Sequence, residues 1–265
     1  MTKERFISTV IPSPVRPAPG AHLPRPKKAA RPSVWLLKSL PFIGLHLACL
    51  AIFWTGAGPA AWVLCVTLYV VRMFGITAGY HRYFSHRAYK TSRPVQFLLA
   101  WLGCSALQKG PLWWAGHHRG HHRYSDTPDD PHSPRETSFW WSHVGWVLSE
   151  EHESTPEEDI QDWARYPELR WLDRYHWVPG VLLAVACFLI AGLPGLVCGF
   201  VLSTVLLYHG TFTINSLSHL IGTRRYATHD DSRNNFVLAL LTLGEGWHNN
   251  HHHYQSSANQ GFFWW

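Results

Sequence analysis

Cysteine is scarce in this chain of 265 residues, and no two of its cysteines form a C-x-x-C pair. The five cysteines are an odd number, and all lie in apolar segments. A disulfide framework and a zinc ribbon are therefore not expected. We interpret the cysteines as small side chains of an apolar core; they are Cys49, Cys65, Cys104, Cys187 and Cys198.

Acidic residues and long apolar runs are missing from the N-terminal region. Residues 1–40 contain eight Lys or Arg but a single acid, Glu4. A secretory signal would need about 7 to 15 consecutive apolar residues near the start. We instead expect residues 1–32 to form a disordered, basic, Pro-rich tail that is attracted to anionic lipid. Much of the net charge of +6 lies in this tail, and residues 82–174 are mixed in sign, so nucleic-acid binding is not expected.

Histidine, in contrast, is abundant and clustered: the chain has 19, and eight of them fall in residues 81–86, 118–122 and 248–252. In an H-x-x-H-H run, residues i, i+3 and i+4 share one helix face, so each run can aim three imidazoles at one point, and two such runs can enclose more than one ion. His81 and His86 are about 140° apart around a helix, so both reach one metal only if the helix ends or bends near residues 80–86.

Imidazole suits iron, zinc, copper or nickel, so the clusters narrow the metal without fixing it. Histidines that stand alone are expected to be hydrogen-bonded core or interface residues, and those beside the clusters are open to either interpretation. The first kind are His22, His46, His143, His152, His176, His209 and His229, and the second are His117, His132 and His253.

Apolar residues are bunched into runs, which is typical of a membrane protein. Two runs near the N-terminus are each close to the ~20 residues that a bilayer span requires. A third, residues 177–212, is long enough for two spans and has a turn signal at Gly192-Leu-Pro-Gly195. The sequence thus predicts an all-α integral membrane protein with four transmembrane helices in two hairpins. Within a single domain, residues 33–265, the expected spans are 34–54, 60–78, 177–192 and 194–212.

The order of spans and clusters predicts which side of the membrane the clusters face. Two crossings precede the first cluster, none separates it from the second, and two more precede the third. All clusters therefore share one side of the membrane with the N-terminal tail. Because basic flanks such as residues 1–40 mark the cytoplasmic side, we expect the N-terminus and a helical cap that carries the clusters to be cytoplasmic. Residues 95–107 are too short to span, and we expect them at the interface or against the bundle.

Around the clusters the sequence resembles the membrane fatty-acid desaturases, in particular the stearoyl-CoA (delta-9) desaturase branch. Gly75-Ile-Thr-Ala-Gly79 precedes the first cluster, and Asn215-Ser-x-x-His219 lies between the second and the third. Further matching motifs are Tyr124-Ser-Asp-Thr127, Asp130-Pro-His132, Ser142-His-Val-Gly-Trp146 and Gly244-Glu-Gly-Trp247. The resemblance is specific, because Asn-Ser-x-x-His separates this branch from other desaturases with three histidine boxes.

The resemblance implies a di-iron centre and a ninth ligand, His219. One iron would take His81, His86, His118, His122 and His251. The second would take His121, His219, His248 and His252, with Asn215 acting through a bound water. Ligating imidazoles need their second nitrogen held by a carboxylate or carbonyl, and the acids beside the clusters are Asp126, Asp129, Asp130 and Glu245.

A fatty-acyl methylene has no acidic proton, so a cofactor must remove its hydrogens. The resemblance implies that two Fe ions, with dioxygen as co-substrate, take two hydrogens and leave a cis double bond, expected at delta-9. The first choice of substrate is an acyl-CoA, and phospholipid or acyl carrier protein is the alternative carrier. Animal members have an Arg-Asp pair where this chain has Gly116 and His117, which weakens the case for their mode of CoA binding.

Three further expectations follow from the resemblance. Electrons would come from a separate ferredoxin-like, rubredoxin-like or b-type cytochrome partner. An apolar tunnel among the membrane helices would position the acyl chain, and Tyr69, about 18 Å along a helix from His81, or Cys65 one turn deeper, would limit chain length. Family members continue beyond the position of Trp265, so we expect that this chain is truncated at its C-terminus.

Other functions compete with desaturation. A di-iron fatty-acyl or lipid hydroxylase could use the same histidines and differ only in its product. A membrane metal-binding or transport protein is disfavoured, because transport sites lie near the bilayer midplane and these clusters lie outside the expected spans. A zinc hydrolase is also disfavoured, because a catalytic zinc site needs only three histidines and a water, and nine candidate ligands are too many for one zinc.

Overall fold

The structure is a computed structural model that describes residues 36–262. These residues form helices and turns, and β pairing among them is limited to isolated bridges of Asn234 with Thr223 and with Trp247. The predicted all-α fold is confirmed for this part of the chain. The predicted tail, residues 1–32, lies outside the described residues, and Pro32–Trp265 groups as one unit.

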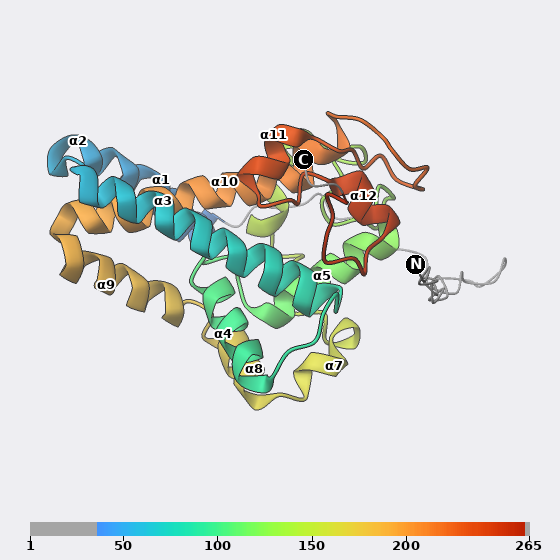
Figure 1. Ribbon diagram of the computed structural model, residues 1–265, viewed down its shortest axis with the longest axis horizontal. Coiled ribbons are helices and arrows are strands. Elements are labelled where there is room, and N and C mark those ends of the chain that lie inside the picture. The colour runs from blue at the N-terminus through green and yellow to red at the C-terminus, as the bar shows by residue number, and fades with distance from the viewer. Residues whose placement is uncertain (1–35, 263–265) are drawn as a thin grey trace, which may run out of the picture. The chain divides into compact units, whose positions relative to one another are not determined.

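Helices account for each apolar run and each histidine cluster (Figure 1). The apolar runs form α1 (Leu36–Ala48), the 3-10 helix η1 (Cys49–Ala51), α2 (Ile52–Thr55), α3 (Pro59–Phe74), the π-helix η2 (Gly75–Ser85), α9 (Val178–Pro194), the π-helix η5 (Gly195–Leu202) and α10 (Ser203–Ser216). The remaining elements are α4 (Arg93–Cys104), α5 (Pro111–Tyr124), α6 (Phe139–His143), η3 (Gly145–Leu148), η4 (Glu157–Asp159), α7 (Gln161–Ala164), α8 (Pro167–Arg174), η6 (Leu217–His219), α11 (Phe236–Leu241) and α12 (His248–His253).

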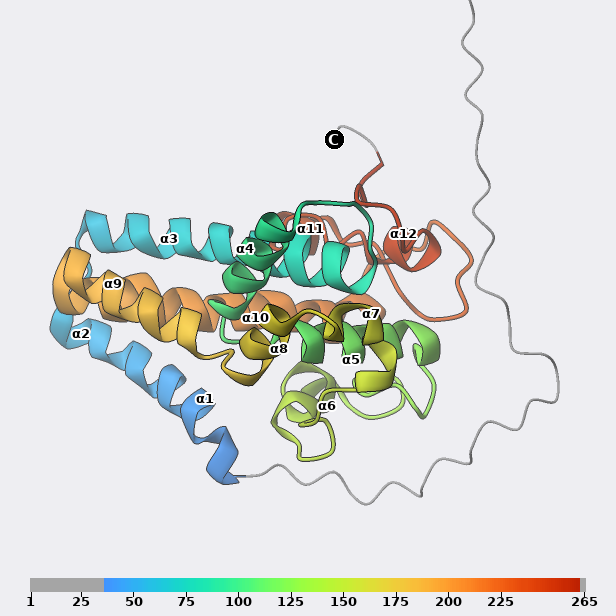
Figure 2. The ribbon, with the colours of Figure 1, turned by 90° about the horizontal axis from the view of Figure 1, so that it is seen from below.

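The apolar helices lie lengthwise beside one another. α3 packs on α10 and η5, and α1 and η1 pack on η5 (Figure 2). Large apolar side chains point away from these contacts, among them Phe53, which is 81% exposed, and Leu189, which is 77% exposed. A broad apolar surface of this kind is suited to lipid rather than to water.

Two stretches of helix are long and apolar enough to cross a membrane, Pro59–Ser85 and Val178–His219, and Ser39–Thr55 is a shorter apolar helix. The 42 residues of the second stretch would measure about 63 Å as one helix, twice the ~30 Å core of a bilayer. Its backbone leaves the helical conformation at Ala191 and Gly192, where Gly192 has a φ of 60° that favours glycine. At this point α9 gives way to η5 and α10, which run back beside it (Figure 2).

The first histidine cluster lies at the end of α3 and η2, a continuous run of helix that packs closely on α4. Two glycines allow the approach: a Cβ on Gly75 would lie 2.9 Å from the carbonyl carbon of Leu102, and one on Gly79 would lie 3.1 Å from Leu99 O. Residues 95–107 overlap α4, and as predicted they pack against the bundle. This packing fixes the position of the first cluster relative to the chain that follows it.

Candidate metal centre

Nine histidines, carried by η2 and its C-terminal cap, α5, η6 and α12, converge into two groups. Within each group the ligand nitrogens all lie within 4.8 Å of one another. The five-histidine group consists of His81, His86, His118, His122 and His251, and the four-histidine group of His121, His219, His248 and His252. The partition is the one that the family resemblance implied.

The H-x-x-H-H runs do not each aim three imidazoles at one point, although their spacing would allow it. In α5, His118 and His122 belong to the five-histidine group, whereas His121 belongs to the four-histidine group. Residues i and i+4 are about 40° apart around a helix, but adjacent residues are about 100° apart. One helix can therefore serve two adjacent sites, and α12 divides its three histidines in the same way.

A π-helix brings His81 and His86 to the same site. The amide of His86 donates to the carbonyl oxygen of His81 at 3.2 Å, and this bond between residues five apart is the mark of a π-helix. η2 ends at Ser85, so the prediction that the helix ends within residues 80–86 is confirmed. The separation of five residues between His81 and His86 does not bring both side chains to one face of an α-helix, but it fits the π-helix that the chain adopts here.

The Nε2 atoms of the five-histidine group face one another. That of His251 lies 3.0 Å from Nε2 of His81 and 2.9 Å from Nε2 of His122. His118 Nε2 lies 3.0 Å from Nε2 of His122 and 2.9 Å from Nε2 of His86. Two nitrogens bound at right angles, each about 2.1 Å from one ion, would be about 3.0 Å apart. The donor atoms therefore fit a metal ion.

Carboxylates hold the outward-facing nitrogen of three histidines in the four-histidine group, whereas Nδ1 of His248 is buried without a hydrogen-bond partner in the described residues. The Nδ1 contacts are His219 to Asp126 at 2.8 Å, His121 to Asp130 at 3.0 Å and His252 to Asp230 at 2.5 Å. A neutral imidazole that donates from Nδ1 has a lone pair on Nε2. Nε2 of His121 and of His252 is buried, and neither has a hydrogen-bond partner within the described residues. A metal ion would satisfy these lone pairs.

The five-histidine group has a comparable outer contact. His81 Nδ1 lies 2.6 Å from one oxygen of Glu245, and the other oxygen of Glu245 lies 3.0 Å from Arg82 Nη2. Three of the four acids predicted from the sequence thus contact a cluster histidine. The fourth, Asp129, is exposed and makes no hydrogen bond or ion pair with a histidine of the described chain.

Sequence reasoning missed Asp230, which contacts His252 from a loop 22 residues away. The available signal was the pair of acids, Asp230-Asp231, between the Asn-Ser-x-x-His motif and the last cluster. Ser232 also donates to Asp230, from its amide at 3.1 Å and from its hydroxyl at 2.5 Å. These bonds fix the carboxylate in the orientation that His252 requires.

Burial favours the neutral, metal-binding form of three imidazoles in the five-histidine group. Burial, with the surrounding histidines, lowers the pKa of His118, His122 and His251 well below its ordinary value. These imidazoles are therefore neutral at pH 7, and neutral imidazole is the ligating form. Burial alone would raise the pKa of Asp126, but the hydrogen bond and charge of His219 outweigh it and lower the pKa to about 2. The ionised carboxylate makes its imidazole partner a stronger ligand.

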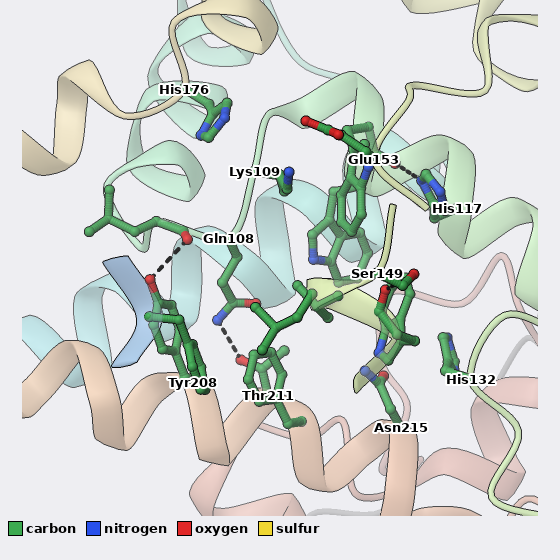
Figure 3. A pocket seen from close by; sticks show the side chains of 18 of the residues that line it. Gln108, Lys109, His117, His132, Ser149, Glu153, His176, Tyr208, Thr211 and Asn215 are labelled. Atoms are coloured by element: carbon green, nitrogen blue, oxygen red, sulfur yellow. Dashed lines mark hydrogen bonds between the residues drawn. The ribbon is translucent and has the colours of Figure 1, made fainter. Parts of the chain in front are cut away.

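A cavity of about 350 Å³ reaches the centre from the side (Figure 3). Its wall includes His118, of the five-histidine group, and His132, whose ring stacks on His121 with centroids 4.2 Å apart. Much of the remaining wall is aromatic, with Trp113, Trp114, Trp146, Tyr208 and Phe212. A flexible apolar molecule in this cavity would lie beside both histidine groups.

Residues 57–258 match the family described as fatty acid desaturase. The chain belongs to the fatty acid desaturase family. It is 39% identical over 226 residues to an acyl-CoA 5-desaturase of Anemone leveillei, and the aligned part is 84% of this chain and 70% of that protein. It is 35% identical over 245 residues to an sn-2 palmitoyl-lipid 9-desaturase of Nostoc sp. (strain 36), covering 91% of this chain and 86% of that protein. An sn-1 stearoyl-lipid 9-desaturase of Anabaena variabilis is 36% identical over 245 residues, covering 89% and 88%.

Membership of this family makes the protein an oxidoreductase of lipid metabolism that acts on fatty acyl chains. The two stretches of apolar helix, together with the family, indicate a membrane protein. The geometry of the histidines is consistent with the metal dependence of such an enzyme.

Three of the six isolated histidines that the structure describes, His46, His143 and His209, have hydrogen-bonded rings, as predicted for them, whereas Nδ1 of His176 is buried without a hydrogen-bond partner in the described residues. His209 joins two others, with Nε2 3.1 Å from His46 Nε2 and Nδ1 3.0 Å from His143 Nε2. The other ring nitrogen of His143 lies 2.9 Å from Ser216 Oγ. These three hydrogen-bonded histidines connect α1, α10 and α6 and lie outside both histidine groups. His22 lies outside the described residues.

Asn215, Tyr69 and Cys65 lie in different surroundings. Asn215 is half-buried in the cavity wall, on the same face of α10 as Tyr208 and Thr211 (Figure 3). The Tyr69 hydroxyl donates to Leu241 O at 2.7 Å and lies beside Gly210, on another face of α10. Cys65 packs with Cys198 and Ala61. Neither Tyr69 nor Cys65 lines this cavity.

Proposed function

We propose that the protein is an oxygen-dependent fatty-acyl desaturase that inserts a cis double bond into a saturated acyl chain at two histidine-bound irons. The observation that carries the proposal is a largely apolar cavity with His118 and His132 in its wall, next to two groups of converging imidazoles. An unactivated methylene offers nothing for an acid or base side chain to attack, so the substrate in such a cavity must be oxidised by a cofactor.

The nine grouped histidines would be the iron ligands, and Asn215 would act through a bound water. Two irons, when bound, would supply the reaction of dioxygen with the acyl chain that removes two hydrogens. The protein's own contribution is position, because the aromatic wall holds a chain in one path and excludes water from it. Asp126, Asp130 and Asp230 would orient three of the imidazoles in the four-histidine group, those of His219, His121 and His252.

The proposed membrane arrangement has four crossings in two hairpins. α1 with α2 and α3 would form the first, and α9 with η5 and α10 the second. Both turns lie at one end of the bundle and α12 lies at the other (Figure 1), which agrees with clusters that share one side of the bilayer. The eight basic residues of residues 1–40 would place that side in the cytoplasm.

The double bond is proposed at delta-9, the position named for the relatives of Nostoc and Anabaena. The relative of Anemone is named as a 5-desaturase, so the position must be measured. Electrons are proposed to come from a separate ferredoxin-like, rubredoxin-like or b-type cytochrome partner. A saturated acyl chain carried by CoA or by a lipid is the proposed substrate.

The test is the fatty-acid profile of cells that express the chain, measured by gas chromatography with mass spectrometry. We expect a new monounsaturated acid, two hydrogens lighter than its saturated precursor, that is absent from cells expressing His121→Ala. Fragmentation of a derivative at the double bond locates it. A product heavier by one oxygen would identify the di-iron hydroxylase instead, and an unaltered profile under adequate iron supply would contradict the proposal.

Chain length provides a second prediction. If Tyr69 limits the accepted chain, as proposed from the sequence, Tyr69→Ala should shift the products towards longer acids. The matched variant Tyr69→Phe keeps the ring, loses only the bond to Leu241 O and should keep the profile. The same chromatography measures both. A profile that Tyr69→Ala leaves unchanged would assign the limit to the residues that line the cavity, such as Tyr208.

A further inference from the structure

The charge at the mouth of the cavity distinguishes between acyl carriers. We infer that the acyl chain enters as part of a membrane lipid with an uncharged or zwitterionic headgroup, and not as an acyl-CoA. The inference rests on the proposed function and specifies the class of its substrate. It departs from the acyl-CoA that the sequence suggested as first choice.

Two carboxylates lie where the cavity opens. Glu150 and Glu153 belong to its lining and are exposed, whereas deeper lining residues such as Ser149 and Trp146 are buried. Lys109 is the one Lys or Arg among the lining residues that the structure describes. Lys109 and Glu153 lie on the side of the cavity opposite Thr211 (Figure 3). The formal charge of Lys and acid side chains in the lining is thus one positive against two negative.

CoA is poorly matched to this mouth. Its diphosphate and 3′-phosphate carry about four negative charges near neutral pH, since a phosphate monoester alone carries nearly two. Proteins bind such groups with clustered Arg and Lys side chains or with free amides at a helix N-terminus. Burial lowers the pKa of His176, another lining residue, to about 4, so this imidazole adds no positive charge at neutral pH.

The helix N-terminus beside the mouth is already occupied by an acid. α5 begins at Pro111, two residues after Lys109. The amides of Leu112 and Trp113 donate to Asp173 Oδ1 at 3.0 and 2.9 Å. A phosphate at this position would have to displace Asp173. The amide groups that would otherwise attract an anion are therefore unavailable to CoA.

The other side of the cavity mouth is formed by residues of the apolar helices. Pro41, in α1, and Trp177, the N-cap residue of α9, line the cavity and are both exposed, Trp177 by 52%. Exposed tryptophan is typical of the interface between bilayer and water. A lipid in the adjacent leaflet could pass its acyl chain between these residues and keep its headgroup at the interface. Glu150 and Glu153 would repel an anionic headgroup but not an uncharged or zwitterionic one.

The experiment uses membranes from cells in which the new monounsaturated acid has been detected, so that a working electron donor is present. One portion is fused with vesicles of deuterium-labelled distearoyl phosphatidylcholine or monogalactosyldiacylglycerol, and another receives deuterium-labelled stearoyl-CoA. ATP and free CoA are omitted to stop acyl exchange. Labelled monounsaturated acid should form in the intact lipid at least about tenfold faster than from stearoyl-CoA. An equal or faster rate from stearoyl-CoA would overturn the inference while leaving desaturation established.

A charge-reversal pair tests the physical cause. Glu150→Lys combined with Glu153→Lys should raise the rate with stearoyl-CoA by about tenfold at low ionic strength, and added salt should remove most of the gain. The matched control, Glu151→Lys with Glu158→Lys, changes net charge equally at exposed acids outside the cavity lining. An equal gain in both variants, or none in the first, would contradict the role of the mouth. Cells that make no new fatty acid at all would instead contradict the proposed function.

Discussion

Replacing His252 with alanine is expected to remove one of two bound irons and to lower desaturation by at least about 100-fold. Loss of a ligand should cost more than the 10- to 100-fold typical for a residue that orients one. His252 is suited to the test because its Nδ1 is held by Asp230 at 2.5 Å and its Nε2 is buried without a hydrogen-bond partner in the described structure. Iron per chain, measured by mass spectrometry of purified protein, and the fatty-acid profile are the two readouts.

The adjacent histidine provides the control for this prediction. His253 is exposed, stacks on Tyr226 with ring centroids 4.3 Å apart and belongs to neither histidine group. His253→Ala should therefore keep both irons and most of the activity. Comparable losses in the two variants would show that general damage to α12, and not ligation, explains the effect. Full activity of His252→Ala would contradict its assignment as a ligand.

Asp230→Asn is expected to weaken iron binding by about 10- to 100-fold, the usual cost of losing a group that orients a ligand. The amide keeps the size of the carboxylate and an oxygen that accepts from Ser232, but it removes the negative charge beside His252. Burial opposes ionisation of Asp230, yet the hydrogen bond and charge of His252 lower the pKa of Asp230 well below its usual range. The native group is thus a carboxylate at neutral pH, and Asp230→Asn removes its charge there.

The measurement is activity as a function of added iron in purified protein. Asp230→Asn should need more iron for half-maximal activity, and saturating iron should restore part of the rate, as a positioning role requires. Asp231→Asn is the matched control, because Asp231 is a half-exposed residue that pairs with Arg135 and Arg224 and reaches Asp126 through its backbone amide. Equal iron requirements in the two variants would exclude a specific role for Asp230.

Much of the fold could be predicted because its signals are local. An apolar run of about 20 residues encodes a helix that can span a bilayer, and the described helices follow the predicted runs. Gly192 marks a turn through its own tolerance of positive φ. The predicted acids Asp126, Asp130 and Glu245 contact histidines. Only Asp130 contacts a histidine of the cluster that it follows in the sequence, His121, whereas Asp126 contacts the distant His219 and Glu245 contacts the distant His81.

What could not be predicted is geometry that no short segment contains. Spacing alone would allow three imidazoles of α5 at one site, but a second site beside α5 takes His121. The π-helix that joins His81 to His86 depends on how η2 packs against α4 and α5. The role of Tyr69 in limiting chain length was inferred from distance along one helix and stays a prediction; that Tyr69 packs on another face of α10 from the cavity could not be read from the sequence.

Residue chemistry and local pattern alone indicate which side chains can bind a metal, which runs are apolar enough for lipid, and which motifs resemble those of the desaturases. Side-chain chemistry and helical periodicity are properties of residues and their near neighbours, so they can be read along the chain. The packing of the helices determines which imidazoles meet, the contact between Asp230 and His252, and the position of Glu150 and Glu153 in the wall of the cavity. Those contacts join residues as far apart as His81 and His251, 170 positions along the chain. They depend on the rotation and packing of whole helices, which local sequence does not specify.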